Sequence, residues 1–326
     1  MRIEFRTLDK AAYPAPGEII VQHGLDVAGE HLGLATVVQA LGVAALPHGK
    51  GDPALVVVPL SAVSPSFDHL LAAEYAQRLI AGETLPPWAA IFAKYAGLVR
   101  EGLSPTALPV ADTLEAFYLA VLNSEGANLK QPSVAEKFLF DWRRLYAAIS
   151  KAGDDGVDPF KTAFLAGNPQ FSREHAFLLH DRSAYLQDVA RGERWIARIP
   201  GGPASSSALI LQDPKSLLFK FWARSDNEAP TGDMYLLLAV NWGRGKWVFS
   251  TDPVQRIPLR DLAAALRRAE QQNDPLAAGK DPWDDGAEFN YTLVSSASGR
   301  TRLSDEQVLK VLRTWCAGQP RLRTNG

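Results

Sequence analysis

The C-terminal half of the chain alternates apolar runs of strand length with polar turn segments. SLLFKFWA at 216–223 and YLLLAV at 235–240 are rich in apolar and aromatic residues. Gly-Arg-Gly at 243–245 then leads directly into KWVFS at 246–250. Runs of this kind, separated by glycine-rich turns, are typical of β-strands. The pattern predicts a three-stranded meander at the centre of a sheet.

Further strands and two helices are expected around this meander. The additional strand-like runs are RWIARIP at 194–200, ALILQ at 208–212 and EFNYTLVS at 288–295. Apolar residues recur at helical spacing over 259–266, which predicts a helix on one face of the sheet. Ser304 and Gln307 have the spacing of a capping box and predict the start of a last helix.

The N-terminal part of the chain follows a strand–helix–strand pattern. An alternating segment at 3–5 and a β-branched run at 18–21 predict two strands, and the apolar spacing over 34–41 predicts a helix. The continuous apolar run ALVVVPL at 54–60 is typical of a strand buried in a parallel sheet. With a further helix expected at about 67–80, this order favours an α/β arrangement.

Between these two parts the pattern becomes helical, with candidate N-caps at Asp112, Ser133 and Ser172. We therefore expect an α/β domain with a helical extension over residues 1–192. The remainder, 193–326, is expected to form a β-rich α+β domain with a mainly antiparallel sheet.

Composition narrows the class of protein without selecting a function. The 326 residues are 47% hydrophobic and 21% charged, which is the balance of a folded globular protein. The formal net charge of −2 provides no global field for binding nucleic acid or anionic membranes. A single cysteine, Cys316, excludes an internal disulfide and a cysteine-based metal cluster. Because the chain starts without an apolar leader and contains no long apolar run, we expect a cytoplasmic protein without membrane contact.

Four residues near two predicted strand ends are candidate metal ligands. His23 and Asp26 follow the strand at 18–21, and Asp68 and His69 follow the strand at 54–60. The carboxyl ends of parallel strands meet at one sheet edge, where ligands commonly bind. Imidazole and carboxylate groups suit Mn²⁺ or Zn²⁺, and such an ion activates water for attack on phosphorus. The alternative is that these side chains hydrogen-bond to the backbone of their loops.

The same residues carry a resemblance to a known family. The segment HGLDVAG at 23–29 resembles the first motif of the DHH phosphoesterase superfamily, and FDHL at 67–70 resembles its Asp-His-His signature. The resemblance implies an α/β domain with a dimetal site and a smaller C-terminal domain. Ala28 and Leu70 stand where the family has its second aspartate and second histidine. The resemblance therefore implies a catalytically degenerate relative that retains the four candidate ligands.

A second resemblance lies near the C-terminus. DPWDDG at 281–286, YTLV at 291–294, GRT at 299–301 and Leu303 together resemble a pattern of proteins from predicted bacterial conflict (defence) operons. Those operons pair an NTPase with partner proteins, so the resemblance implies a protein partner. The alternative is a tight surface turn before an edge strand.

Three basic residues in glycine-containing loops are candidate contacts for an anion, nucleotide or oligonucleotide: Lys50, Arg244 and Lys246. A phosphate-binding role for the loop GGPASSS at 201–207 is less favoured, because it lacks the Lys-Ser/Thr ending of a P-loop. No Gly-x-Gly-x-x-Gly follows the strand at 18–21, and Cys316 has no nearby histidine, which disfavours dinucleotide binding and cysteine catalysis. Two functions remain, a non-catalytic or weakly catalytic component of a bacterial defence or regulatory assembly, and a metal-dependent phosphoesterase or nuclease.

Overall fold

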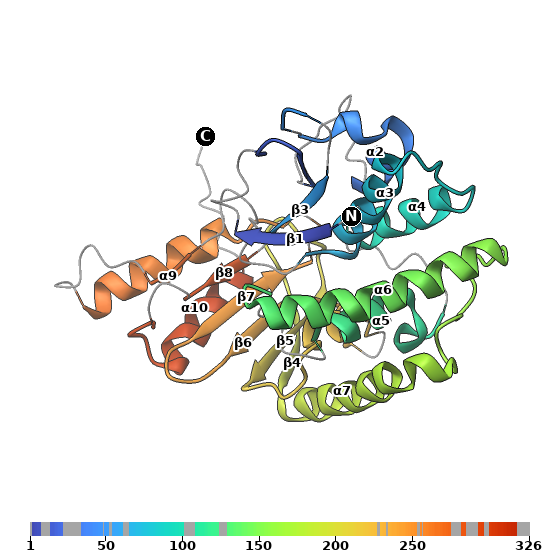
Figure 1. Cartoon of the computed structure of the whole chain (residues 1–326). Coiled ribbons are helices and arrows are strands. Elements are labelled where there is room, and N and C mark those ends of the chain that lie inside the picture. The colour runs from blue at the N-terminus through green and yellow to red at the C-terminus, as the bar shows by residue number, and fades with distance from the viewer. Residues whose placement is uncertain are drawn as a thin grey trace, which may run out of the picture. The chain divides into compact units, whose positions relative to one another are not determined.

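The chain forms two compact units, Met1–Leu179 and His180–Gly326, called here the N-terminal and C-terminal units. The division falls within helix α7 (Ser172–Arg191), whereas the sequence placed the domain boundary just after this helix, at 192. No helix of the described chain is both long and apolar enough to cross a membrane. The computed structural model (Figure 1) describes residues 2–7, 14–21, 34–47, 49–51, 54–60, 65–100, 108–123, 129–226, 229–232, 234–252, 255, 257–274, 282–284, 293–296 and 300–317.

The N-terminal unit combines a parallel sheet with a set of helices. Its elements are β1 (Arg2–Thr7), β2 (Glu18–Ile20), α2 (Leu34–Leu41), η1 (Val43–Ala45), β3 (Leu55–Leu60), α3 (Phe67–Ile80), α4 (Ala89–Arg100), η2 (Val110–Asp112), α5 (Leu114–Asn123), α6 (Pro132–Asp154), η3 (Pro169–Phe171) and the first residues of α7. The strand order is β1–β3–β2, and both neighbouring pairs are parallel. β3 is the central strand, with Val56, Val57 and Val58 fully buried, as its continuous apolar run predicts.

Aromatic side chains from four helices form the core of the helical extension. Phe67 of α3 packs against Tyr95, Tyr118 and Trp142, with ring centroids 5.6–6.4 Å apart. All four side chains are at most 3% exposed. Tilted and edge-to-face contacts of this kind stabilise a core beyond the area that they bury.

None of the three predicted helix caps is observed. Ser172 is already the first residue of α7, with helical φ and ψ angles of −59° and −34°. The hydroxyl of Thr113, not the side chain of Asp112, accepts the N–H of Ala116 at the start of α5. Asp112 instead belongs to η2. Ser133 lies inside α6, because the helix already begins at Pro132, a residue favoured in the first helical turn.

The C-terminal unit contains a mixed sheet and the helices that pack on it. After the end of α7 its elements are β4 (Glu193–Ala197), β5 (Ser206–Gln212), α8 (Phe219–Ala223), β6 (Tyr235–Asn241), β7 (Trp247–Thr251), α9 (Arg260–Asn273), β8 (Leu293–Ser295) and α10 (Asp305–Ala317). The strand order is β4–β5–β6–β7–β8. The β5–β6 pair is parallel and the other neighbouring pairs are antiparallel. The predicted combination of helices and strands is confirmed, while the predicted antiparallel character is met only in part.

The predicted strand at 216–223 is wrong. This segment forms a turn and the short helix α8. The position beside β6 that was predicted for residues 216–223 is occupied by β5. Two carboxylates of α7 explain the difference. Asp188 accepts the N–H groups of Lys215 and Ser216, and Asp181 accepts that of Leu217. Because these backbone donors are used by α7, they do not enter a strand ladder.

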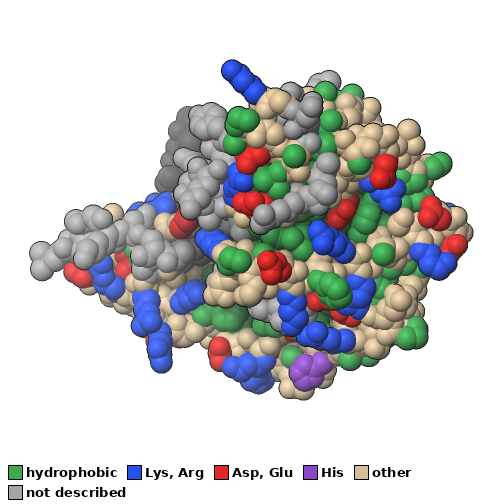
Figure 2. Space-filling view, viewed as in Figure 1, with side chains coloured by type: hydrophobic (Ala, Val, Ile, Leu, Met, Phe, Trp, Pro, Cys, Tyr) green, Lys and Arg blue, Asp and Glu red, His purple; other side chains and the backbone are tan. Residues whose placement is uncertain are grey.

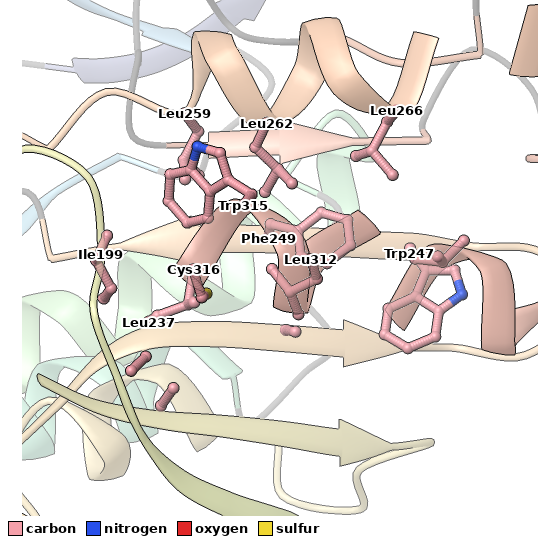
Figure 3. Close-up of a cluster of buried hydrophobic side chains, with 14 of the residues drawn as sticks. Ile199, Leu237, Trp247, Phe249, Leu259, Leu262, Leu266, Leu312, Trp315 and Cys316 are labelled. Carbon is pink, nitrogen blue, oxygen red and sulfur yellow. The ribbon is translucent and has the colours of Figure 1, made fainter. Parts of the chain in front are cut away.

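Helices α9 and α10 cover one face of the mixed sheet (Figure 3). Their buried side chains, including Leu262, Leu266 and Leu312, pack with Trp247 and Phe249 of β7. The predicted capping box at the start of α10 is confirmed. The hydroxyl of Ser304 accepts the N–H of Gln307, and the Gln307 side chain accepts the N–H of Ser304.

Candidate functional site

The edge of the parallel sheet predicted to hold a metal is partly described. β2 and β3 are parallel neighbours, so their carboxyl ends lie at the same edge of the sheet, as the sequence predicts. Asp68 and His69 lie in the first turn of α3, the helix that follows β3. His23 and Asp26 lie outside the described residues.

Asp68 caps a helix other than its own. Its carboxylate is fully buried, and its two oxygens accept the N–H groups of Leu34 and Ala35 at 2.7 and 2.9 Å. These N–H groups belong to the first turn of α2, where backbone donors have no partner within the helix. A negative charge is also favourable at this end of the helix dipole. Asp68 therefore fixes the entry of α2 against α3.

His69 caps its own helix. Its N–H donates to the Ser66 hydroxyl at 3.3 Å, and its Nδ1 lies 2.8 Å from the same hydroxyl oxygen and 3.3 Å from the Ser66 backbone nitrogen. This is a capping box in which histidine takes the position usually held by Glu or Gln. Within the described part of the chain, no group of three or more His, Cys, Asp or Glu side chains is arranged to hold a metal ion. The four-residue metal site therefore stays a prediction.

The three residues predicted to contact an anion belong to two different units of the chain. Lys50 belongs to the N-terminal unit, where its carbonyl accepts the N–H of Gly17 at 2.9 Å, just before β2 begins. It thus lies at the amino ends of β2 and β3, the opposite edge of the sheet from Asp68. Arg244 and Lys246 both lie in the turn between β6 and β7 of the C-terminal unit, and both are exposed.

The turn between β6 and β7 has a tightly specified backbone. Gly243, Arg244 and Gly245 all have positive φ angles, of 76°, 52° and 75°. Trp242 donates its N–H to the carbonyl of Lys246 at 2.8 Å, which closes the turn. A Cβ atom at Gly245 would lie 2.6 Å from the carbonyl oxygen of Thr301, so only glycine fits. The two glycines of the Gly-Arg-Gly segment therefore set the direction of the turn that carries Arg244.

Trp242 is exposed beside this turn and is supported by α8. The residue is 38% exposed, and its ring packs edge-to-face with that of Phe219, with centroids 5.9 Å apart. Asp181 of α7 holds α8 in place, because it accepts the Trp222 indole N–H at 2.8 Å and the Leu218 N–H at 3.1 Å. Sequence reasoning missed this support, although Asp181 and Asp188 stand seven residues apart, a spacing that puts both on one face of a helix.

Sequence reasoning also missed an open groove in the C-terminal unit. The groove has a volume of about 1600 Å³ and runs between α9 and α10 beside the loop that follows β4. Its apolar surface is made by small, partly buried side chains and one buried tryptophan from the two helices: Ala264, Ala265, Ala269, Val311 and Trp315. The buried indole N–H of Trp315 has no hydrogen-bond partner in the described chain, an arrangement that is uncommon in folded proteins.

The charges that line the groove are mostly positive. Arg198, Arg268 and Lys310 are exposed, and none of them forms an ion pair with a described residue. Asp261 is the one acidic residue among the lining side chains that the structure describes. Figure 2 shows several Lys and Arg side chains on the face that carries α9 and α10 in Figure 1. The groove thus combines an apolar floor with an excess of uncompensated positive charge.

The C-terminal conflict-operon pattern contributes to packing where it is described. Trp283 is 2% exposed, and its carbonyl accepts a hydrogen bond from Arg267 of α9 at 2.8 Å. The hydroxyl of Thr301 donates to the buried carboxylate of Glu270 and accepts the N–H of Leu303. Residues 281, 285, 286, 291, 292 and 299 of the pattern lie outside the described chain. These contacts fix the segment that leads into α10.

Cys316 does not provide a nucleophile. Its side chain is 4% exposed, and burial raises the pKa of the thiol to about 12. The thiol is therefore neutral at physiological pH, and the thiolate is the nucleophilic form.

No protein-family model matches the chain, and neither a curated protein nor a solved structure shows significant similarity to it. The chain's own residues and the two short resemblances are therefore what indicates its function.

Proposed function

We propose that the protein is a non-catalytic binding component of a cytoplasmic bacterial defence or regulatory assembly, and that the α9–α10 groove receives a segment of its protein partner. The observation that carries the proposal is the apolar floor of the groove beside three unpaired basic side chains, Arg198, Arg268 and Lys310. The resemblance near the C-terminus supports an NTPase as the partner.

The groove lining is suited to binding rather than to catalysis. Nucleophilic catalysis needs an activated nucleophile with a base in hydrogen-bond reach. Among the described lining residues there is no histidine and no cysteine. The hydroxyl of Thr314 donates to the carbonyl of Lys310, one turn earlier in α10, at 2.8 Å. Its proton is directed at the backbone, not at a general base.

The partner segment that fits best is an acidic amphipathic helix. The 14 residues of α9 span about 21 Å, which matches a partner helix of similar length. The small side chains of Ala264, Ala265 and Ala269 allow a helix backbone to approach closely, and the three cations would pair with its acidic residues. Recognition of an apolar helix face in a groove is a common mode of binding between proteins.

The test is to purify the tagged full-length chain from its own bacterium, as wild type and as two double variants. Arg268→Glu with Lys310→Glu reverses charge inside the groove. Lys94→Glu with Arg182→Glu reverses two exposed charges outside it and serves as the control. We expect one NTPase-containing protein to co-purify with wild type and control. Purified partner should then bind the groove variant at least tenfold more weakly than either of them. Equal binding by all three proteins would contradict the proposal.

A metal-dependent phosphoesterase of the DHH type is a second candidate, favoured by one observation. β2 and β3 are parallel, so their carboxyl ends lie at one sheet edge. In the sequence His23 and Asp26 follow the first of these strands, and Asp68 and His69 follow the second. Mn²⁺ or Zn²⁺ held there would activate a water for attack on phosphorus. The capping hydrogen bonds of Asp68 and His69 compete with such ligation.

Metal analysis of the purified, tag-free chain tests this candidate. His69→Gln is the informative variant, because a Ser-x-x-Gln capping box keeps the start of α3 intact while the imidazole is removed. The candidate requires about one Mn or Zn ion per chain in the wild type and its loss in the variant. If the wild-type chain stays metal-free after incubation with Mn²⁺ or Zn²⁺, the phosphoesterase candidate is wrong.

A further inference from the structure

A second surface of the C-terminal unit combines an exposed aromatic ring with clustered cations. We call Trp242, Arg244, Lys246 and Arg300 the tip surface. The three basic side chains are exposed, and none forms an ion pair within the described chain. Arg300 adjoins the turn, because its Cβ lies 3.3 Å from the position that a Cβ of Gly245 would occupy.

The tip surface lies at the carboxyl end of the parallel strand pair. β5 and β6 run in the same direction, with Gln212 beside Asn241 at their ends. The loop after β5 joins the same edge, since Asp213 donates its N–H to the carbonyl of Asn241 at 2.7 Å. This edge is the usual ligand-binding edge of sheets with parallel strands. Leu217 of the same loop adds apolar surface, because it is 62% exposed.

The aromatic ring is held in a fixed position. The ring of Trp242 packs edge-to-face with that of Phe219, and the hydrogen bond that closes the turn fixes its backbone. A supported tryptophan with an exposed ring surface is a platform on which a nucleobase stacks. Nearby cations are then placed to contact the phosphates that flank that base.

We propose that the tip surface binds single-stranded nucleic acid, with one base stacked on Trp242 and the adjoining phosphates contacted by Arg244, Lys246 and Arg300. The site reads no sequence, because stacking and phosphate contacts are available to every base. It is separate from the groove residues Arg268 and Lys310, so the proposal stands independently of the proposed function.

The test is fluorescence anisotropy with the full chain and a fluorescein-labelled (dT)₁₅ oligonucleotide, titrated in KCl from about 25 to 300 mM. Three phosphate contacts give a slope of log K against log salt of about −2 for a single strand. Trp242→Ala should weaken binding at least fivefold, and Trp242→Phe should restore most of it, because a ring is again available for stacking. Arg244→Asn keeps a residue that tolerates a positive φ angle, and it should reduce the slope by about 0.7.

The control is Lys94→Gln, which removes an exposed lysine outside both the tip surface and the groove and should leave the affinity unchanged. Far-ultraviolet circular dichroism and the thermal midpoint establish that each variant is folded. Three results would overturn the proposal: no binding at 25 mM KCl, equal binding by wild type and Trp242→Ala, or equal competition by polyglutamate. The last result would assign the tip surface to an acidic protein.

Discussion

Replacement of Asp181 by alanine should strongly destabilise the C-terminal unit. The Asp181 carboxylate is 4% exposed and accepts four hydrogen bonds. The donors are the Ser216 hydroxyl, the N–H groups of Leu217 and Leu218, and the Trp222 indole, at 2.7–3.1 Å. Alanine leaves all of them without this acceptor, in a region that is largely closed to water.

The size of the loss follows from these contacts. A hydrogen bond to a charged group contributes about 1.5–3 kcal/mol, but bonds that share one acceptor group do not add independently. Each buried donor that is left without an acceptor costs about 1–3 kcal/mol, and part of this cost is relieved as the donors rearrange. We therefore expect Asp181→Ala to lower the free energy of unfolding by about 4 kcal/mol. For a folding unit of this size that corresponds to a fall in Tm of about 8–16 °C.

Urea titration followed by tryptophan fluorescence measures this loss. Asp181→Asn keeps the shape and one acceptor oxygen, so it should lose about half as much as alanine. Arg182→Ala, which alters the exposed neighbour, should change stability by no more than about 0.5 kcal/mol. If Asp181→Ala also stays within about 1 kcal/mol of wild type, the hydrogen-bond argument is wrong.

Three other substitutions test separate features. Burial raises the pKa of Glu115 from 4.5 to about 8, so between these pH values the folded state keeps a proton that the unfolded state releases. The free energy of unfolding therefore decreases as the pH rises from about 4.5 to about 8. Glu115→Gln should remove that dependence and be more stable than wild type at pH 8 by roughly 2–4 kcal/mol in urea titrations. Gly245→Ala should lower the urea midpoint more than Gly243→Ala, because only Gly245 faces a close carbonyl, that of Thr301. Asp68→Ala should cost about 1–3 kcal/mol in thermal unfolding, through the lost cap of α2.

Much of the strand and helix content could be predicted from local pattern. The run at 54–60 is apolar throughout because β3 is the middle strand of a parallel sheet. The helix at 259–266 and the capping box at Ser304 were equally local, since each depends on residues within a turn or two. Such elements are specified by neighbours in the chain, and the sequence therefore contains the information directly.

The errors and omissions came from contacts between distant segments. The run at 216–223 has the composition of a strand, and only the carboxylates of Asp181 and Asp188, about 30 residues earlier, turn it into a loop and helix. The α9–α10 groove likewise appears only when two helices more than 30 residues apart in the chain pack side by side. Nothing in the local pattern of either helix marks which face remains uncovered.

The support under the tip surface links stability to the proposed nucleic-acid binding. Asp181 holds the segment that leads into α8, α8 presents Phe219, and Phe219 supports Trp242. We therefore expect Asp181→Asn to weaken (dT)₁₅ binding although it contacts no nucleotide. If the weakening only tracks the fraction of unfolded chain, raising stability with sucrose, an uncharged osmolyte, should abolish it. If the weakening persists in fully folded protein, Asp181 positions the Trp242 ring through α8 and Phe219. The same carboxylate that prevents a strand at 216–223 would then also hold the nucleic-acid site in its binding geometry.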